Sequence, residues 1–213
     1  MVTPRPVRPR SAYRILPARP FAAAATMLLF TFLLYVIEVY DSATGQALDR
    51  EDGIIPRETD HLTGVLFAPL LHAGWPHLEG NTPFFLILGF LAMAGGLGQW
   101  VAVTALVWVV SGLGVWFLAP DGTITVGSSG VIFGWLVFLL FRGFFVGSLK
   151  QILLAVVLFF FWGGMLLGVL PGQPEVSWQA HLFGAIGGLL AARMVGTADR
   201  RPAYQDEVPE PPR

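Results

Sequence analysis

Long apolar runs separated by short polar connections fill most of the chain, and six of these runs come close to the length of a membrane-spanning helix. A helix needs about 20 apolar residues to cross the hydrocarbon layer of a bilayer. The runs occupy residues 21–40, 78–98, 101–119, 129–141, 153–170 and 178–195. The fourth and the sixth are shorter or more interrupted than the others. The pattern predicts an all-α membrane protein built as a bundle of six transmembrane helices.

The segments outside these runs are polar. Residues 1–20 carry five arginines and no acidic residue, and residues 197–213 are polar and rich in proline. We therefore predict two tails around a membrane domain at 21–196. The long connection at 41–76 has an apolar second half (61–75) that is too short and too interrupted to cross a bilayer. We expect that half to lie in the membrane interface.

Composition agrees with this interpretation and excludes several classes of protein. Hydrophobic residues make up 54% of the chain and charged residues 13%, whereas soluble domains carry about a quarter charged residues. A net charge of −1 gives no indication of a nucleic-acid partner. The chain has no cysteine, which excludes disulfides and thiolate metal sites.

The distribution of basic residues predicts the orientation in the membrane. With the N-terminus in the cytoplasm, six spans return the C-terminus to the same side, and 11 of the 13 Lys and Arg residues then lie inside. Only Arg50 and Arg57 lie outside. Because Lys and Arg are enriched in cytoplasmic loops, we expect both termini in the cytoplasm.

Polar side chains at the outer ends of three spans are candidates for function, because such groups are costly inside a bilayer. Ser129 begins the fourth span within Gly127-Ser128-Ser129-Gly130, and His181 lies near the start of the sixth. Taken alone, the serine is also explained as a helix cap and the histidine as a core residue bonded to a carbonyl.

His77 and Asn81 enter the second span four residues apart, so they share a helix face. A zinc site was the alternative there. It is disfavoured because Glu79 points elsewhere on a helix and no His-x-x-x-His pair occurs. We expect no metal and no cofactor.

Together these residues match the needs of acyl transfer. A histidine beside a serine removes the hydroxyl proton as the serine attacks a carbonyl, and further donors stabilise the oxyanion. Gly184 and Gly188, four residues apart, allow the sixth span to approach the fourth and bring His181 to Ser129. Glu175 is six residues before His181 in a loop, so a dyad is favoured over a triad.

The motifs resemble those of the rhomboid family of intramembrane serine proteases, in the same order and over nearly the whole membrane part. They are His-x4-His-x3-Asn (His72, His77, Asn81), Gly-x-Ser-Gly (Gly127 to Gly130) and His-x2-Gly-x3-Gly (His181, Gly184, Gly188). The resemblance implies a six-helix bundle with Ser129 as nucleophile and His181 as general base. It also implies oxyanion stabilisation by His77, Asn81 and the Ser129 N–H, with His72 in a supporting role.

The resemblance further implies an active site open to the outer face and membrane-anchored substrates cut in or near their transmembrane segment. Phe133 stands where some members have a tyrosine, and we expect it to pack on His181. Ser128 is expected to shape the turn only. The Trp-Arg pair that many members carry in the first outer loop is replaced by Pro56-Arg57.

Two other functions fit less well. A catalytically inactive rhomboid-like protein that binds transmembrane clients normally lacks the serine or the histidine, and both are present. A transporter or channel needs polar residues along its path, whereas here they gather at the outer ends of the spans. The oligomeric state is left open, and a bacterial plasma membrane is the expected location.

Overall fold

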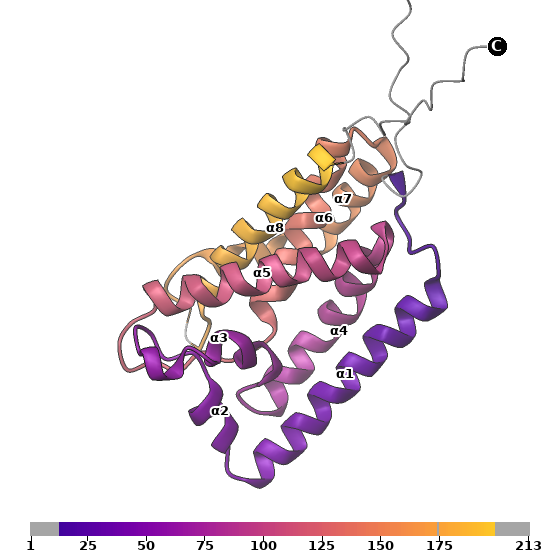
Figure 1. Ribbon diagram of the computed structural model, residues 1–213. Coiled ribbons are helices and arrows are strands. Elements are labelled where there is room, and N and C mark those ends of the chain that lie inside the picture. The colour runs from indigo at the N-terminus through magenta and orange to yellow at the C-terminus, as the bar shows by residue number, and fades with distance from the viewer. Residues whose placement is uncertain (1–12, 174, 199–213) are drawn as a thin grey trace, which may run out of the picture.

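Helices form nearly all of the architecture in the computed structural model, which describes residues 13–173 and 175–198 (Figure 1). The α-helices there are α1 (Pro20–Ala43), α2 (Ala47–Asp52), α3 (Gly64–Phe67), α4 (Trp75–Ala92), α5 (Leu97–Leu118), α6 (Ser129–Val146), α7 (Leu149–Trp162) and α8 (Trp178–Ala198). Short 3-10 helices are η2 (Thr59–His61), η3 (Ala68–Leu70), η4 (Met93–Gly95) and η5 (Gly163–Val169). Within those ranges no β-strand forms, and extended backbone pairs at one antiparallel bridge, Ile54 to Thr125.

Within the part of the chain that the structure describes, six helices are long and apolar enough to cross a membrane, which confirms the predicted fold class. They are α1, α4 with η4, α5, α6, α7 with η5, and α8. Large apolar side chains on α1 and α7 are exposed, such as Phe32 and Phe160, and this surface suits contact with lipid. The two predicted tails fall mostly outside the described residues.

The central helix is α6, whose side chains are almost all buried. It lies against α8, α7, α4 and α5, while α1 packs on α4 at the edge of the bundle. In Figure 1 the long helices run side by side, and α1 begins at the same end at which α8 finishes. Burial on all sides explains why α6 holds apolar residues around its whole circumference.

Several predicted helix boundaries were wrong; the second span, for example, ends at Gly95 and not at residue 98. The fourth span does not stop at residue 141 but continues as α6 to Val146, because Arg142 is buried over the Phe138 ring instead of marking the membrane surface. The fifth span is not one helix over 153–170. It ends as an α-helix at Trp162, where two glycines follow, and continues as η5.

The loop between α1 and α4 folds back onto α5 rather than crossing the bundle. The Trp108 indole N–H donates a hydrogen bond to the Val65 carbonyl at 3.0 Å. A Cβ on Gly112 would lie 2.8 Å from a Val65 methyl group, so α3 rests directly on the helix. Its location in the membrane interface stays a prediction.

Asp49 in α2 lies in an acidic cluster with Asp41 and Glu38 from the end of α1, and all three are buried. Burial first, and then the neighbouring carboxylates of Asp41 and Glu38, raise the pKa of Asp49 to about 7. The Asp41 Oδ1 atom already accepts a hydrogen bond from the Leu48 N–H at 2.7 Å. The fold therefore favours a protonated Asp49.

A raised pKa in the folded state makes stability fall as pH rises through it. We expect the Asp49 contribution to be complete below pH 4 and lost by about pH 7. Asp49→Asn removes this titration. In detergent, the difference in thermal midpoint between the variant and the wild type should therefore shift in favour of the variant as the pH rises from 4 to 8. Glu51→Gln, on the exposed side of α2, is the control. A constant difference between Asp49→Asn and wild type would contradict the prediction.

Candidate active site

A cavity of about 530 Å³ opens at one end of the bundle, between α4, the 119–128 loop, α6 and α8. Ser129, His181, His77 and Asn81 all line it. The four residues that the sequence singled out as a possible catalytic set therefore face one space, although they come from three helices far apart in the chain.

Ser129 is the first residue of α6, and the turn before it depends on Gly127. Gly127 has a φ of +122°, a conformation that residues with a side chain rarely adopt. A Cβ there would also lie 2.6 Å from Cε1 of His77. Gly127 thus lets the chain turn into α6 while His77 stays close, and the free N–H groups at the start of α6 lie near the serine.

His181 is held by two contacts. Its Nδ1–H donates to the Gly168 carbonyl at 3.1 Å, and its ring stacks on Phe133 with centroids 3.9 Å apart and planes inclined by 8°. Because a carbonyl only accepts, the bond puts the proton of the neutral ring on Nδ1 and leaves Nε2 as a base. Among the described residues no hydrogen bond joins His181 to Ser129.

Gly168 was missed by the sequence analysis. A Cβ at this position would lie 2.9 Å from His181 Nδ1 and 3.0 Å from the Phe133 ring, so only glycine leaves room for both. The residue lies in η5, inside a run that the sequence presents as uniform apolar helix. No feature of the sequence in that run indicates that one of its carbonyls accepts a hydrogen bond from a histidine.

His77 and Asn81 present donors to the cavity from one face of α4. His77 Nδ1 accepts the Ala73 N–H at 3.3 Å, which places the proton of the neutral ring on Nε2. The Nδ2 atom of Asn81 is buried and has no hydrogen-bond partner in the part of the chain that the structure describes. Both side chains are therefore free to donate to a negatively charged oxygen.

His72 and Ser128 form a buried pair behind the cavity, with His72 Nε2 and Ser128 Oγ 3.2 Å apart. Burial lowers the pKa of His72 to about 3, so its ring is neutral. The ring meets that of His77 edge-on, with centroids 5.2 Å apart. His72 thus supports His77, and Ser128 has a hydrogen-bond partner in addition to its place in the turn.

Glycines set the spacing between α6 and α8. A Cβ on Gly184 would lie 2.0 Å from the Gly130 carbonyl oxygen, and one on Gly188 2.1 Å from that of Gly134. The close approach expected of Gly184 and Gly188 is present. Gly134 was not singled out in the sequence, although it follows Gly130 by four residues and repeats the same helical spacing.

The two glutamates near the motifs have different positions. Glu79 is exposed and does not line the cavity, whereas Glu175 lies at the cavity wall in the loop before α8. No group of three or more histidine or acidic side chains suited to a metal ion occurs within residues 13–173 and 175–198. Ser129, His181, His77 and Asn81 are the residues at the cavity whose types suit acyl transfer.

A model of the Rhomboid domain matches residues 59–198, about two thirds of the chain. The chain belongs to the rhomboid family. An uncharacterised protein of Mycobacterium tuberculosis (strain ATCC 25618 / H37Rv) is 44% identical over 204 residues, covering 91% of this chain and 85% of its own. One of Mycobacterium leprae (strain TN) is 44% identical over 191 residues, covering 86% and 75%. The protein of Bacillus subtilis (strain 168) named "Putative rhomboid protease YdcA" is 29% identical over 187 residues, covering 83% and 87%.

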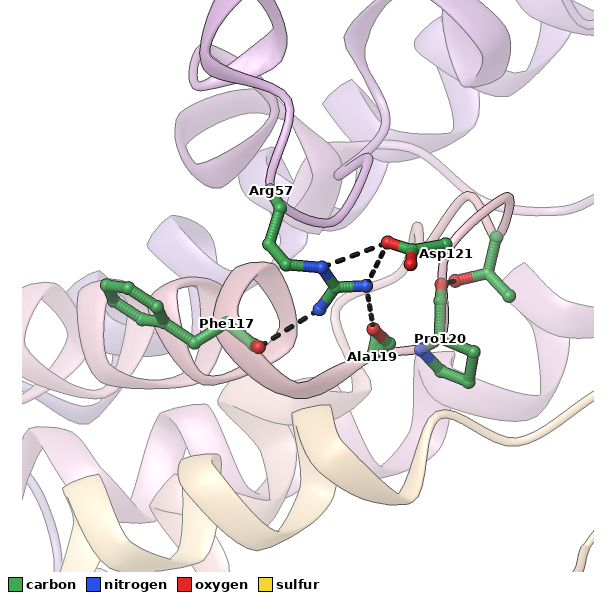
Figure 2. Close-up of polar contacts among 6 residues, drawn as sticks. Arg57, Phe117, Ala119, Pro120 and Asp121 are labelled. Carbon is green, nitrogen blue, oxygen red and sulfur yellow. Dashed lines mark hydrogen bonds and ion pairs between the residues drawn. The ribbon is translucent and has the colours of Figure 1, made fainter.

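In this rhomboid Arg57 attaches the first long loop to the end of α5 and the residues that follow it, as Figure 2 shows. The guanidinium forms an ion pair with Asp121 and donates to the carbonyls of Phe117 at 3.1 Å and Ala119 at 2.8 Å. Carbonyls at a helix C-terminus have no partner within the helix, so an arginine there satisfies them. Pro56-Arg57 thus gives the loop a defined attachment at the end of α5.

Proposed function

We propose that the protein is an intramembrane serine protease that hydrolyses peptide bonds in or near transmembrane segments of membrane-anchored proteins. The observation that carries the proposal is the convergence of Ser129, His181, His77 and Asn81 on one cavity, with His181 held so that Nε2 is the basic atom. Membership of the rhomboid family supports the same activity.

In the proposed reaction His181 Nε2 takes the hydroxyl proton while Ser129 Oγ attacks the carbonyl carbon of the scissile bond. The negative charge on the carbonyl oxygen is stabilised by the Asn81 amide, the His77 Nε2–H and the Ser129 backbone N–H. His181 then gives its proton to the leaving nitrogen as the C–N bond breaks. Water hydrolyses the acyl-enzyme by the same steps, with His181 again acting as base.

We also propose that the cavity opens to the outer face of a bacterial plasma membrane and that both termini are cytoplasmic. The excess of Lys and Arg in the segments at the opposite end of the bundle supports this orientation. The relatives in Mycobacterium and Bacillus support a bacterial location.

Activity-probe labelling tests the proposed chemistry without knowledge of the substrate. A fluorophosphonate reacts with an activated serine, so the purified protein in detergent should be labelled, and mass spectrometry should find the adduct on Ser129. His181→Ala should abolish labelling because the hydroxyl then has no base. Labelling of Ser128 instead, or equal labelling of His181→Ala, would refute the assignment.

Asn81→Leu tests the oxyanion role. Loss of one preorganised donor lowers kcat by roughly 10²- to 10³-fold, because the bond forms fully only in the transition state, and KM should change little. The measurement is cleavage of a fluorogenic transmembrane peptide. Glu79→Gln, two residues away on an exposed position, should cleave like wild type. A change confined to KM would assign Asn81 to substrate binding instead.

A further inference from the structure

Gln179 is a polar side chain in the cavity that neither the dyad nor the oxyanion site uses. It lies on α8 two residues before His181, only 5% of its surface is exposed, and it lines the cavity. Its carboxamide has no hydrogen-bond partner among residues 13–173 and 175–198. Its polar atoms are not among the fully enclosed side-chain atoms that lack a partner, so they reach the cavity and can bond to a ligand there.

The chemistry of the site identifies the kind of ligand. A transmembrane segment must lose its helical hydrogen bonds around the bond that is cut, because attack on a carbonyl requires access to it. Each freed N–H and C=O then needs a new partner inside the bundle, where water is scarce. A carboxamide offers one acceptor and two donors, which is the complement of a peptide unit.

The position of Gln179 fits such a contact. His181 lies on the same helix, and Thr123 to Val126 also line the cavity. A chain that reaches Ser129 enters a cavity that the start of α8 also lines. Glu175 is an exposed polar residue that lines the cavity, and it lies in the loop before α8. Gln179 and His181 are the buried polar residues of α8 that line the cavity, and Gln179 is the one without a proposed catalytic role.

We propose that the Gln179 carboxamide binds the main chain of the unwound substrate next to the scissile bond. This inference rests on the proposed protease function. The contact discriminates in favour of segments that open locally into an extended backbone, since a peptide that keeps its helical hydrogen bonds has no free group for Gln179. It therefore contributes to selection by helix stability rather than by side-chain identity.

Gln179→Met tests the contact, because methionine keeps the length of the side chain and removes its polar atoms. The substrate is a fluorogenic transmembrane peptide whose cut site by the wild-type enzyme has been mapped by mass spectrometry. We expect kcat/KM to fall roughly tenfold, the effect of one neutral hydrogen bond in a desolvated site. Fluorophosphonate labelling of Ser129, which needs no peptide main chain, should stay at the wild-type rate.

Ester substitution in the peptide locates the bond. Replacing single peptide N–H groups beside the cut site by ester oxygens should slow the wild-type enzyme at one position, and Gln179→Met should have lost that sensitivity. The matched control is Gln173→Met, since that amide already donates to the Leu167 carbonyl and lies off the cavity. It should behave as wild type in every assay.

Two results would overturn the inference while leaving the protease function intact. One is wild-type cleavage and unchanged ester sensitivity in Gln179→Met. The other is an equal loss of labelling and cleavage, which would assign Gln179 to support of the dyad. A wild-type protein that neither labels nor cleaves would refute the proposed function, and this inference with it.

Discussion

Ser129→Ala should lower kcat for a transmembrane peptide by roughly 10⁴-fold or more, the largest effect expected of any single substitution in this rhomboid. In the proposed reaction this hydroxyl is the atom that forms the acyl-enzyme, so its removal stops the chemistry. Binding of the substrate depends on other residues, so KM should change little. Fluorophosphonate labelling should disappear entirely.

The neighbouring serine provides a matched control. Ser128 differs from Ser129 by one position, yet its hydroxyl is buried against His72 and does not line the cavity. Ser128→Ala loses one hydrogen bond, worth about 1 kcal/mol of stability, and should keep activity within about tenfold of wild type. Ser129→Ala should keep the wild-type thermal midpoint, because the described residues offer its hydroxyl no hydrogen-bond partner.

Opposite results would reverse the assignment. If Ser128→Ala abolished labelling and Ser129→Ala retained it, the nucleophile would be Ser128 and the cavity would require rearrangement to expose it. If both variants cleaved as wild type, neither Ser128 nor Ser129 would be the nucleophile and the proposed reaction would be refuted. Measuring labelling and cleavage together separates loss of chemistry from loss of substrate access.

The sequence predicted those features that depend on the length of apolar runs and on the spacing of polar residues. Apolar length alone predicted the six spans, and the spacing of His77, Asn81, Ser129 and His181 predicted residues that line one cavity. These predictions depend on local pattern and on the cost of polar groups in a bilayer. Neither requires knowledge of which helices touch.

Features that depend on contact between distant segments could not be predicted. Arg142 has the sequence signature of a span end, and only its burial over Phe138 shows that α6 continues. Gly168 orients His181 through a backbone carbonyl, which every residue type possesses. Gln179 looked like an ordinary residue of the first turn of a helix until the cavity beside it was known.

Gly184→Ala should disrupt both stability and activity, although it adds a single methyl group. The new Cβ would lie 2.0 Å from the Gly130 carbonyl oxygen and 2.9 Å from its carbon, and backbone cannot move aside as a flexible side chain can. The two helices must separate. Overpacking of this kind costs about 1–3 kcal/mol, so the thermal midpoint in detergent should fall.

Activity should fall further than the loss of stability accounts for. Gly130 follows Ser129, and Gly184 lies one turn after His181, so separation of α6 from α8 moves nucleophile and base apart. A displacement of about 1 Å in reacting groups costs about 10²-fold in rate. We expect kcat at a temperature where the variant is folded to drop by about that factor, together with the rate of fluorophosphonate labelling.

Two further alanine substitutions separate the explanations. Gly98→Ala adds a Cβ that meets nothing within 4 Å, and since alanine favours helix it should leave stability unchanged or raise it slightly. Gly188→Ala meets the Gly134 carbonyl oxygen at 2.1 Å but lies a further turn from the dyad, so it should cost similar stability and less activity. Equal activity losses at 184 and 188 would mean that the helices move as rigid bodies. Wild-type behaviour of Gly184→Ala would show that the dyad does not depend on this close approach.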